Sequence, residues 1–372
     1  MTETEERIVQ VGFERTAEDR SASFLQNGDT VLESRVTAEA GPGGQNAAQP
    51  LVLLSTGEAA RRYPELVRKY WWQAVPKDKD EFTRATAGAA EEHGYFVLVR
   101  AGRKVAFPVQ ACIFLSQAGA SQKVHNVVIV EDGAELNMIS GCASDPLATE
   151  AEHFGISEIY IGKGAKLSFT MLHAWGPKVK VRPRTTVIVE EGGTYISNYI
   201  NMEGCADIEM NPLTRLVGKG AVCRLNSVIV APQGSHMDIG GRAELEVEGT
   251  KAEIVARTIG LGGEVINRGT LAGHAEGVKA HLECHGLMLS DEGYISAIPQ
   301  LDAFHGNCEM SHEAAVGRIA PEEIEYLMAR GLAEEEATAT IVRGFLNVNI
   351  EGLPAQLAEK IRQTLDQFSL KK

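Results

Sequence analysis

Several motifs that would assign a function directly are missing from this chain of 372 residues. No CxxC pair occurs, so the spacing argues against a zinc ribbon or a ferredoxin-type cluster site. No Walker motif, GxxxxGK[ST], occurs either, and the chain is therefore not expected to hydrolyse ATP itself. There is no apolar run near 18 residues, so no membrane span is expected. The acidic start TETEER after Met1 is unlike a secretory leader.

Clustered positive charge is also scarce. The chain has 36 Lys and Arg against 50 Asp and Glu, a formal charge of −14, and no Lys/Arg run. Binding to a nucleic-acid backbone needs such clusters, so this class of partner is disfavoured. Six scattered cysteines in a chain of this size do not form the dense pattern of a disulfide framework. We therefore expect reduced thiols and a cytoplasmic location.

Near-copies of one turn recur between residues 110 and 310. The turns VEDGAE, IGKGAK, VEEGGT, VGKGAV and VEGTKAE place glycines at 133, 164, 192, 220 and 249, spaced by 31, 28, 28 and 29 residues. Short strands rich in Val, Ile and Leu follow each turn, with no helical segment between them. A fixed period of this kind favours a β-solenoid over an antiparallel sandwich, which would not need the same turn in every repeat.

Different patterns flank this repeat region. Residues 1–60 resemble an exposed or weakly packed arm, and 57–75 predicts a helical segment with Leu66, Val67, Tyr70 and Trp71 on one side. A second helix is expected over DEFTRATAGAAEEHG, ending at Gly94. Two strands joined at Ala101-Gly102 follow within 95–109. Residues 1–109 are thus expected to be a partly flexible region of helices and short strands.

The last part of the chain predicts helices. Pro321 suits a first helical turn, and Gly331 suits a stop. The acidic start of LAEEEATATIVRGFL suits the helix dipole, with Ala337, Ile341, Val342 and Phe345 on one face. PAQLAEKIRQTLDQF adds a third helix. We expect residues 311–372 to form a helical domain that either caps the solenoid or also docks a partner.

Soft and borderline metal ligands gather between residues 281 and 318, in HLECHGLMLSDEGYISAIPQLDAFHGNCEMSHEAAVGR. Such ligands suit iron, zinc or a sulfur cluster better than magnesium or calcium. In a strand, Cys284 and His285 would point to opposite faces, so Cys284 needs partners from a later segment or a second chain. His312 and Glu313 could instead belong to a helix N-terminus that Ser311 caps, where Glu313 would favour the helix dipole.

These residues also carry a family resemblance. A Cys followed by an apolar strand, a Ser-Asp-x-Gly turn, a Pro and then SHEAAVGRI before a Glu-rich helical pair resembles the C-terminal half of the SufB/SufD family. These are scaffold subunits of the SUF iron–sulfur cluster assembly machinery. The resemblance covers about residues 75–372 and is strongest after 280. It implies a mainly β fold, a right-handed parallel β-helix core flanked by a small α/β N-terminal region and a C-terminal α-helical domain.

The resemblance implies a sulfur acceptor in SGCASDPLATEAEH. From the residues alone, Cys142 follows a strand in a loop where Gly141 and Pro146 indicate close backbone approach, and most free cysteines are simply buried. The pattern Gly-Cys-Ala-x-x-Pro, with a His eleven residues on, is similar to the SufB motif that holds the persulfide-accepting Cys.

The segment TMLHAWG supplies further candidates. His173 and Trp175 share a face if the segment is a strand, and a core role is the commoner one for such a His. The family carries a polar residue, a spacer and Trp at this place, in a path thought to carry sulfur through the β-helix. The basic residue expected after Trp is Arg184 or Arg182.

The resemblance also implies where a cluster is assembled. Cys284 matches the SufB interface cysteine, Glu313 the SufB acidic residue and His312 the SufD interface histidine. A two-fold dimer would bring two copies of these ligands together around a transient iron–sulfur cluster. The second-tier candidate ligands are His285, His305, Cys308 and Glu309. The remaining cysteines are expected in the core, in apolar strands; they are Cys112, Cys205 and Cys223.

The implied protein is an assembly scaffold rather than an enzyme. Its partners would be a SufC-type ABC ATPase at the C-terminal helices, a second copy or a SufB/SufD paralogue, and a sulfur donor. Two alternatives stay open. One is a SufD-like structural subunit that binds the ATPase and holds no cluster. The other is a carbohydrate-active β-helix enzyme, although the single Trp of the core and the missing Asp/Glu ladder disfavour it.

Overall fold

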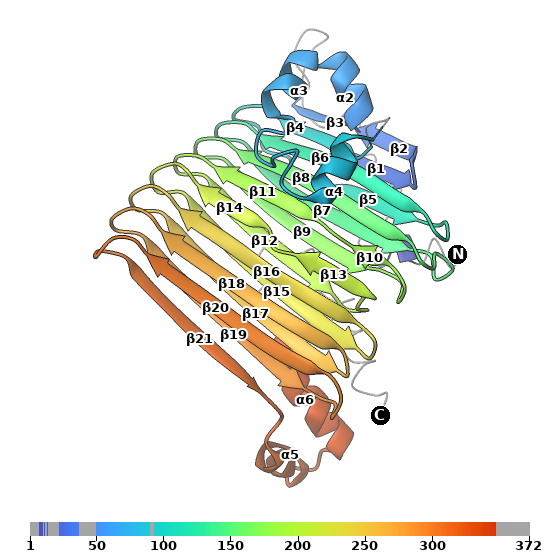
Figure 1. Cartoon of the computed structure of the whole chain (residues 1–372). Helices are drawn as coiled ribbons and strands as arrows, with labels where there is room; N and C mark the ends of the chain where they lie inside the picture. The colour runs from blue at the N-terminus through green and yellow to red at the C-terminus, as the bar shows by residue number, and fades with distance from the viewer. Residues whose placement is uncertain are drawn as a thin grey trace.

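The chain winds into a solenoid of parallel strands (Figure 1). The computed structural model describes residues 7–9, 11, 13, 22–36, 50–89 and 93–346. Successive rungs stack from the N-terminal end to the C-terminal end, and apart from two antiparallel pairs at the N-terminal end, each strand pairs in parallel with the strand one turn further along. The parallel ladders confirm the predicted β-solenoid and exclude the antiparallel sandwich.

Two sheets face each other across the solenoid, here named sheet A and sheet B. In spatial order, sheet A contains β2 (Thr30–Val36), β1 (Ala22–Asn27), β5 (Val109–Leu115), β7 (Glu135–Ser144), β9 (Lys166–Ala174), β12 (Thr194–Asn201), β15 (Val222–Pro232), β17 (Lys251–Leu261), β19 (Lys279–Met288) and β21 (Glu309–Gly317). In chain order, sheet B contains β3 (Leu51–Ser55), β4 (Tyr95–Val99), β6 (Ser121–Val130), β8 (Glu152–Ile161), β10 (Lys180–Val181), β11 (Arg184–Val189), β13 (Asp207–Met210), β14 (Leu213–Leu216), β16 (His236–Leu245), β18 (Glu264–Gly273) and β20 (Tyr294–Ala303).

The repeated glycines occupy the turn position that was predicted for them. The φ angles at 133, 164, 192, 220 and 249 are 65°, 61°, 64°, 69° and 73°, a left-handed conformation that side chains disfavour. The turns also stack, because the N–H of Gly164 donates to the carbonyl of Glu191 at 2.8 Å and that of Gly192 to the carbonyl of Lys219 at 3.0 Å. Gly102 and Gly277 continue the same stack at its two ends.

Side-chain alternation divides each strand into a lumen side and an outer side. The lumen core is one apolar cluster that extends through every rung and includes Phe24, Leu136, Phe169, Leu225 and Leu282. A second apolar cluster lies on the outer face of sheet A, where Val342 and Leu346 contribute to it. The strand register therefore decides which residues can meet inside the solenoid.

The N-terminal arm is better ordered than its composition predicted. Residues 22–36 form the antiparallel hairpin β1–β2, and β1 extends sheet A by pairing with β5. The expectation of a weakly packed arm is therefore wrong for these residues, whereas 37–49 lie outside the described part. The strand expected within 103–109 is reduced to one bridge at Lys104, and β5 begins at Val109.

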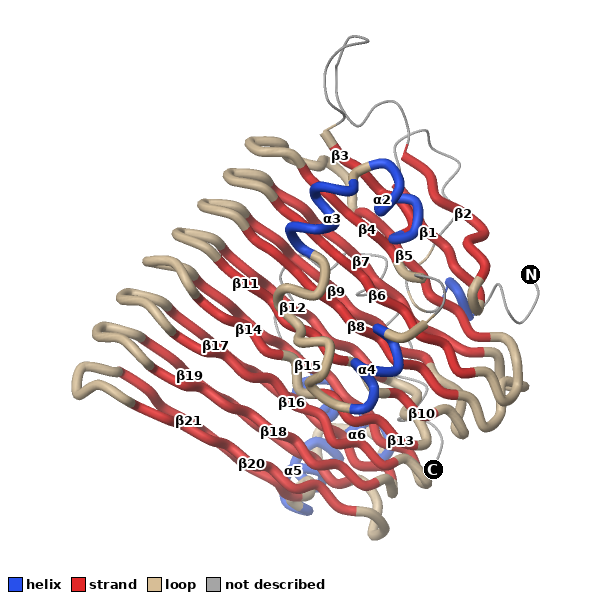
Figure 2. Tube along the Cα trace, turned by 45° about the horizontal axis from the view of Figure 1, so that its top comes forward, coloured by secondary structure: helices blue, strands red, loops and turns tan. Residues whose placement is uncertain are grey.

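Three short helices lie against the N-terminal rungs, around sheet B in Figure 2. The segment predicted over 57–75 divides at Pro64 into α2 (Thr56–Arg62) and α3 (Pro64–Tyr70). Its predicted apolar side does pack against the solenoid. The next helix, α4 (Glu81–Ala87), has Gly88 rather than Gly94 at its C-terminus. Gly94 instead begins the approach to β4, where a Cβ would stand 2.6 Å from the His125 carbonyl oxygen.

A buried carboxylate fastens this helical segment to sheet B. Glu158 accepts backbone N–H bonds from Ala74 at 2.6 Å and Val75 at 3.0 Å, and it meets His125 Nε2 at 2.8 Å. Burial alone would raise the pKa of Glu158, but the His125 bond and charge and the backbone donors outweigh burial and lower it. Glu158 is therefore held ionised as the acceptor for the loop that follows α3.

The C-terminal part departs from the expected boundary. The domain boundaries expected between residues 109 and 110 and between residues 310 and 311 fall inside β5 and β21. The solenoid therefore continues to Gly317. Two helices follow, α5 (Pro321–Met328), with Pro321 in its first turn, and α6 (Glu334–Leu346). The third predicted helix, over 354–368, lies outside the described residues. Among the described helices, none combines the length and apolarity needed to cross a bilayer.

We expect Gly220→Val to destabilise the protein by about 1–2 kcal/mol, because φ at this residue is +69° and a β-branched side chain resists it. A Cβ at Gly220 meets no atom within 4 Å, so backbone conformation alone should cause the loss. Gly306→Val is the matched control, since Gly306 also has open space around it but no positive φ. Equal urea midpoints for the two variants would contradict the argument.

Candidate functional site

Cys142 lies inside the solenoid, near the end of β7. Its side chain is 4% exposed and belongs to the lumen core. The expected loop is therefore wrong, because residue 142 is still within the ladder, with its Cα paired to that of His173 on β9. The close approach expected at Gly141 is present, since a Cβ there would stand 2.5 Å from the Val11 carbonyl oxygen.

His173 and Trp175 face the same lumen, as their spacing predicted. Their rings contact edge-on, with centroids 5.6 Å apart. His173 Nδ1 lies 3.1 Å from the hydroxyl of Tyr199. Burial lowers the pKa of His173 to about 3, with a further contribution from His153, so the imidazole is neutral at physiological pH.

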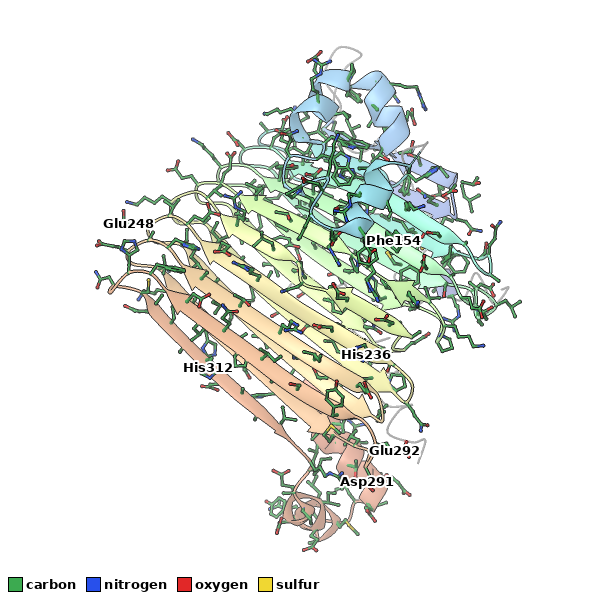
Figure 3. All side chains as sticks on the ribbon, viewed as in Figure 1. Phe154, His236, Glu248, Asp291, Glu292 and His312 are labelled. Atoms are coloured by element: carbon green, nitrogen blue, oxygen red, sulfur yellow. The ribbon has the colours of Figure 1, made fainter. Side chains whose placement is uncertain are left out.

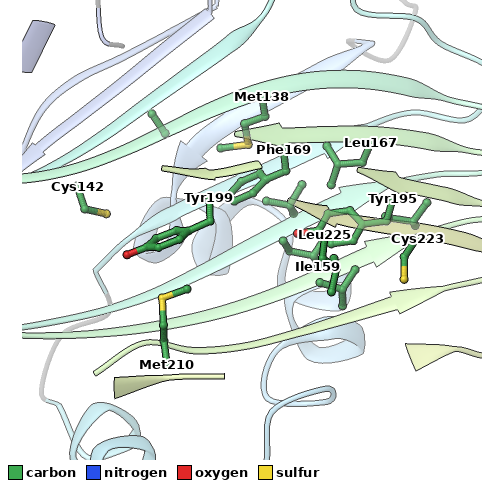
Figure 4. Close-up of a cluster of buried hydrophobic side chains, with 14 of the residues drawn as sticks. Met138, Cys142, Ile159, Leu167, Phe169, Tyr195, Tyr199, Met210, Cys223 and Leu225 are labelled. Atoms are coloured by element: carbon green, nitrogen blue, oxygen red, sulfur yellow. The ribbon is translucent and has the colours of Figure 1, made fainter. Parts of the chain in front are cut away.

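Two further residues at this place, His153 and Tyr199, were not assigned from the sequence. The rings of His153 and Trp175 contact in a tilted arrangement with centroids 4.8 Å apart, and Tyr199 contacts the His173 ring. Burial is the main cause that raises the pKa of Tyr199; the hydrogen bond with Asn201 opposes this shift, and the thiols of Cys205 and Cys142 add to it. Figure 4 shows the hydroxyl end of Tyr199 directed toward the side where Cys142 lies. We name Cys142, His153, His173, Trp175 and Tyr199 the lumen corner.

The sequence did contain one signal for this group. His153 is the histidine eleven residues after Cys142, and its position near the start of β8 places it across the turn from the end of β7. For Tyr199 and Cys205 no motif was available, because their contacts depend on the stacking of β12 on β9. Cys205 also lies in a loop rather than in the expected strand, although it is buried.

Arg184 does not join the lumen corner. Its guanidinium lies on the outer face of sheet B, where it pairs with Asp80 and, at 2.9 Å, with Glu209. Arg182 lies on the same outer side and pairs with Asp207. Both cations lie over the ring of Phe82, the residue through which α4 docks. The structure therefore brings Cys142, His173 and Trp175 together and separates them from either arginine.

A cavity of about 100 Å³ runs through the lumen beside this corner. Cys142, His153, His173 and Tyr199 line it at one end, and Ala256 lines it further along. The cavity exists because small lumen residues such as Thr185 and Ser227 line it from both sheets. It can hold several waters or small polar species. Ala256 is the Cα partner of Cys284, so the cavity reaches the strand next to that cysteine.

Cys284 faces the lumen from β19, and His285 faces outward, as predicted. Cys284 is 1% exposed and belongs to the lumen core, whereas His285 Nδ1 lies 3.4 Å from Glu283 on the outer side. Burial raises the pKa of Cys284 to about 11, although the charge of Arg257 opposes the shift. In this arrangement the thiol is protonated and shielded from solvent.

His312 and Glu313 lie on β21, the last strand of sheet A, so the alternative of a helix cap is wrong. His312 is the Cα partner of Leu282 and shares the lumen side with Cys284, while Glu313 is the partner of Glu283 and shares the outer side. Figure 3 shows His312 on this final rung. One protomer therefore does not bring Cys284, His312 and Glu313 to one point.

The second-tier candidates do not complete a site either. His305 and Glu309 are exposed near the turn before β21, and Cys308 is half-buried, with its Sγ 3.6 Å from the Ala275 carbonyl oxygen. Within residues 7–346, as far as they are described, no three His, Cys, Asp or Glu side chains are arranged to hold a metal ion. Cys112 and Cys223 are buried core residues, as predicted.

The fold and the site define a class of protein: a parallel β-solenoid that encloses a lumen containing buried thiols and histidines. The sequence model described as "SUF system FeS cluster assembly, SufBD core domain" matches residues 113–345. The chain belongs to the SufBD family of iron–sulfur cluster assembly proteins.

Relatives in this family extend over nearly the whole chain. An Archaeoglobus fulgidus protein named "Iron-sulfur cluster assembly SufBD family protein" is 46% identical over 97% of this chain and 94% of its own length. A Methanothermobacter thermautotrophicus protein of the same name is 39% identical over 99% and 88%. The Bacillus subtilis "Iron-sulfur cluster assembly protein SufB" is 28% identical over 86% of this chain and 69% of its own length.

We expect the six thiols of the native protein to differ sharply in alkylation by iodoacetamide at pH 8. Burial raises the pKa of Cys142, Cys205 and Cys223 to about 12, which leaves roughly one thiolate in ten thousand at this pH. The half-buried Cys308 should react first by at least about tenfold, as measured by peptide mass spectrometry.

A denatured sample supplies the control, since all six thiols should then react at similar rates. Replacing Cys308 by Ser should remove the fast phase of the native protein. Fast labelling of Cys142 or Cys284 in the native protein would show that the lumen admits solvent readily.

Proposed function

We propose that this protein is a scaffold subunit for iron–sulfur cluster assembly, in which Cys142 accepts sulfur as a persulfide. The sulfur moves along the lumen past His173 and Trp175. The cluster is cargo, assembled by Cys284, His312 and Glu313 where two copies of the chain meet. All six cysteines are free, which suits this chemistry and a reducing cytoplasm. We also propose that the solenoid winds in a right-handed sense, as the family resemblance implies, because parallel crossovers almost always take that hand.

The observation that carries this proposal is the unpaired edge of β21. No described strand pairs with its outer edge, and most of its residues are exposed. Open backbone edges of this kind pair readily with another chain. Exposed Tyr294, Ile298 and Val316 on the same final rungs add an apolar surface. A two-fold contact at this edge would bring His312, Glu313 and the nearby Cys284 of both copies together.

A cluster site of this kind also needs the last rung to move. Cys284 and Glu313 point to opposite sides of sheet A, and Cys284 is covered in the isolated chain. Rotation of two subunits about their contact is one way in which such a buried site becomes accessible. On the outer side, His285 and Glu283 lie next to Glu313 by register and are the nearest additional ligands.

The cavity supports a sulfur route between the two cysteines. Cys142 and Cys284 both face the lumen, five ladder steps apart along sheet A, which is roughly 24 Å at the usual strand spacing. The cavity covers most of that length. Leu282 packs against Gly269 near its far end, where a Cβ at Gly269 would stand 2.4 Å from Leu282. Leu282 is the Cα partner of His312 on β21, so movement of β21 would uncover this closure.

The C-terminal helices are the proposed docking surface for a SufC-type ATPase. Tyr326 and Met328 on α5 are exposed apolar side chains, and Arg330 stacks on Tyr326. The chain lacks a phosphate-binding loop of the Walker type, so ATP hydrolysis is assigned to the partner. The second subunit is either a further copy of this chain or a SufB/SufD paralogue.

We expect Cys284→Ser to lose the cluster formed by anaerobic reconstitution with iron and sulfide, because it removes the proposed sulfur ligand on the strand that pairs with β21. Visible absorption and bound iron per protomer measure the loss, which should exceed about tenfold. Cys223→Ser, another buried lumen thiol, is the matched control and should load normally. Normal loading of Cys284→Ser would instead favour the SufD-like structural subunit.

We expect Val316→Lys to shift the protein from dimer to monomer in analytical ultracentrifugation. The substitution places a charge on the exposed final rung, and charged residues there oppose edge-to-edge pairing. Leu147→Lys is the control, since Leu147 is a more exposed apolar side chain on a turn remote from β21. If the Val316→Lys protein remains dimeric, the dimer interface does not lie at this edge.

A further inference from the structure

The two histidines of the lumen corner are held in fixed tautomers, beginning with His153. The side-chain N–H₂ of Gln122 donates to the carbonyls of Gly28 at 3.0 Å and Phe114 at 3.1 Å, which fixes the orientation of its amide. Its carbonyl oxygen therefore faces His153 Nδ1, 2.8 Å away, and must accept a hydrogen bond from it. His153 consequently carries hydrogen on Nδ1, and its Nε2 is a bare lone pair.

His173 is held in the opposite tautomer. Asn201 accepts the N–H of Gly204 at 3.0 Å, so its amide nitrogen is the atom that donates to the Tyr199 hydroxyl at 3.3 Å. The buried hydroxyl proton of Tyr199 then has His173 Nδ1 as its acceptor. His173 therefore carries hydrogen on Nε2, and the corner presents one ring acceptor and one ring donor.

Free space is left at the bare nitrogen of His153. Within the described part of the chain Nε2 has no hydrogen-bond partner, and it lies over Gly155, where a Cβ would approach to 2.8 Å. Glycine at 155 thus leaves room for this edge of the ring. His153 lines the cavity together with Cys142 and His173. Trp175 Nε1 is also buried and has no partner among the described residues.

We propose that His153 Nε2 is the proton acceptor for the Cys142 thiol, and that Gln122 is the positioning residue that holds His153 in the required tautomer. The proposal rests on the sulfur-acceptor role proposed above for Cys142. It adds the group that makes a buried thiol reactive. The Nε2–H of His173, which lines the same cavity, is the donor available to the anionic end of a persulfide.

The step needs no oxidant when a low-molecular-weight persulfide, RS–SH, supplies the sulfur. The S–H bond of Cys142 breaks and its proton passes to His153 Nε2 as the sulfur attacks the outer sulfur of RS–SH. The donor S–S bond breaks, and its electron pair leaves on RS⁻, which takes the proton back from the imidazolium. The products are RSH and the Cys142 persulfide, Cys142–S–SH.

Burial explains why the base must act in the same step as the attack. It raises the pKa of Cys142 to about 12 and lowers that of His153 to about 3, so a lone thiolate or imidazolium is disfavoured. An ion pair formed in one step keeps the cavity neutral, because the two charges compensate each other. The other titratable groups around it are buried, and Arg268 lines the far end of the cavity; the buried groups are His173, Tyr199, Tyr195, Cys205 and Tyr95.

The test is the pH dependence of Cys142 modification by methyl methanethiosulfonate, a small reagent that does not titrate, followed by mass spectrometry of the Cys142 peptide. In the wild type the rate should be flat from pH 6 to 9, because His153 is neutral throughout. His153→Gln should lower the rate at pH 7 about 10²-fold and make it rise tenfold per pH unit, since only free thiolate then reacts.

Two variants separate proton transfer from packing. His173→Gln replaces the other imidazole of the lumen corner but leaves the proposed base, so its profile should stay flat. Gln122→Met removes the acceptor that fixes the tautomer and should slow the reaction without introducing a slope. A folded His153→Gln protein with the wild-type rate and a flat profile would overturn the proposal, and so would a tenfold rise per pH unit in the wild type.

A measurement on the unmodified protein is independent of every variant. Nitrogen NMR of labelled histidines should show His153 with hydrogen on Nδ1 and a bare Nε2, and the reverse tautomer would overturn the proposal. The sulfur-acceptor role is read separately, as persulfide on Cys142 after incubation with glutathione persulfide. If no persulfide forms on Cys142 while the wild-type pH profile is flat, the sulfur-acceptor role of Cys142 is rejected. The role of His153 as the proton acceptor of that thiol then stands.

Discussion

Backbone pairing between successive rungs is the constraint on which this structure depends. Each parallel strand satisfies its N–H and C=O groups only through the strands before and after it. The glycine turns keep that stacking in register over seven positions, from Gly102 to Gly277. Among the strands that the structure describes, the same rule leaves the last rung, β20 and β21, paired on one side only. The open edge is therefore a direct result of the architecture and not an accident of one sequence.

Side-chain parity follows from the same ladders and decides the chemistry of the lumen. Because residues paired in a parallel ladder point to the same side, Cys142, His173 and Asn201 form one inward row. Cys284 lies in the neighbouring inward row, with Tyr199 and Ala256. The two cysteines thus share one enclosed space even though 142 positions of sequence separate them. Glu313 and Arg184 lie outside that space because both side chains point to the outer side of their sheets.

The repeat region was the part of the fold that could be predicted from the sequence. The glycine period identified the solenoid, and alternation placed Cys284 and His285 on opposite sides and His173 with Trp175 on one side. Boundaries were less predictable, because Pro64 divides a helix whose apolar side is continuous and β21 continues beyond residue 310. Composition misjudged residues 22–36, since pairing with β5 supplies the order that their own sequence does not indicate.

The site was predictable only where a residue's own strand decided its position. Cys142 was expected in a loop, because nothing within SGCASDPLATEAEH shows that the ladder continues through residue 144. The grouping of His153, Tyr199 and Cys205 around Cys142 depends on three different rungs. The orientation of the His153 ring depends on its hydrogen bond to Gln122, which is itself bonded to Gly28. Such contacts arise from stacking, and a linear pattern does not contain them.

The short connection between β21 and α5 has a mechanical consequence. Only residues 318–320 separate the last strand from the first C-terminal helix, so a pull on the helices acts on one end of β21. Load applied at a strand end opens ladder bonds one after another, whereas load along the strand must break them together. The terminal rung can therefore be peeled away with little work while the stack behind it stays closed.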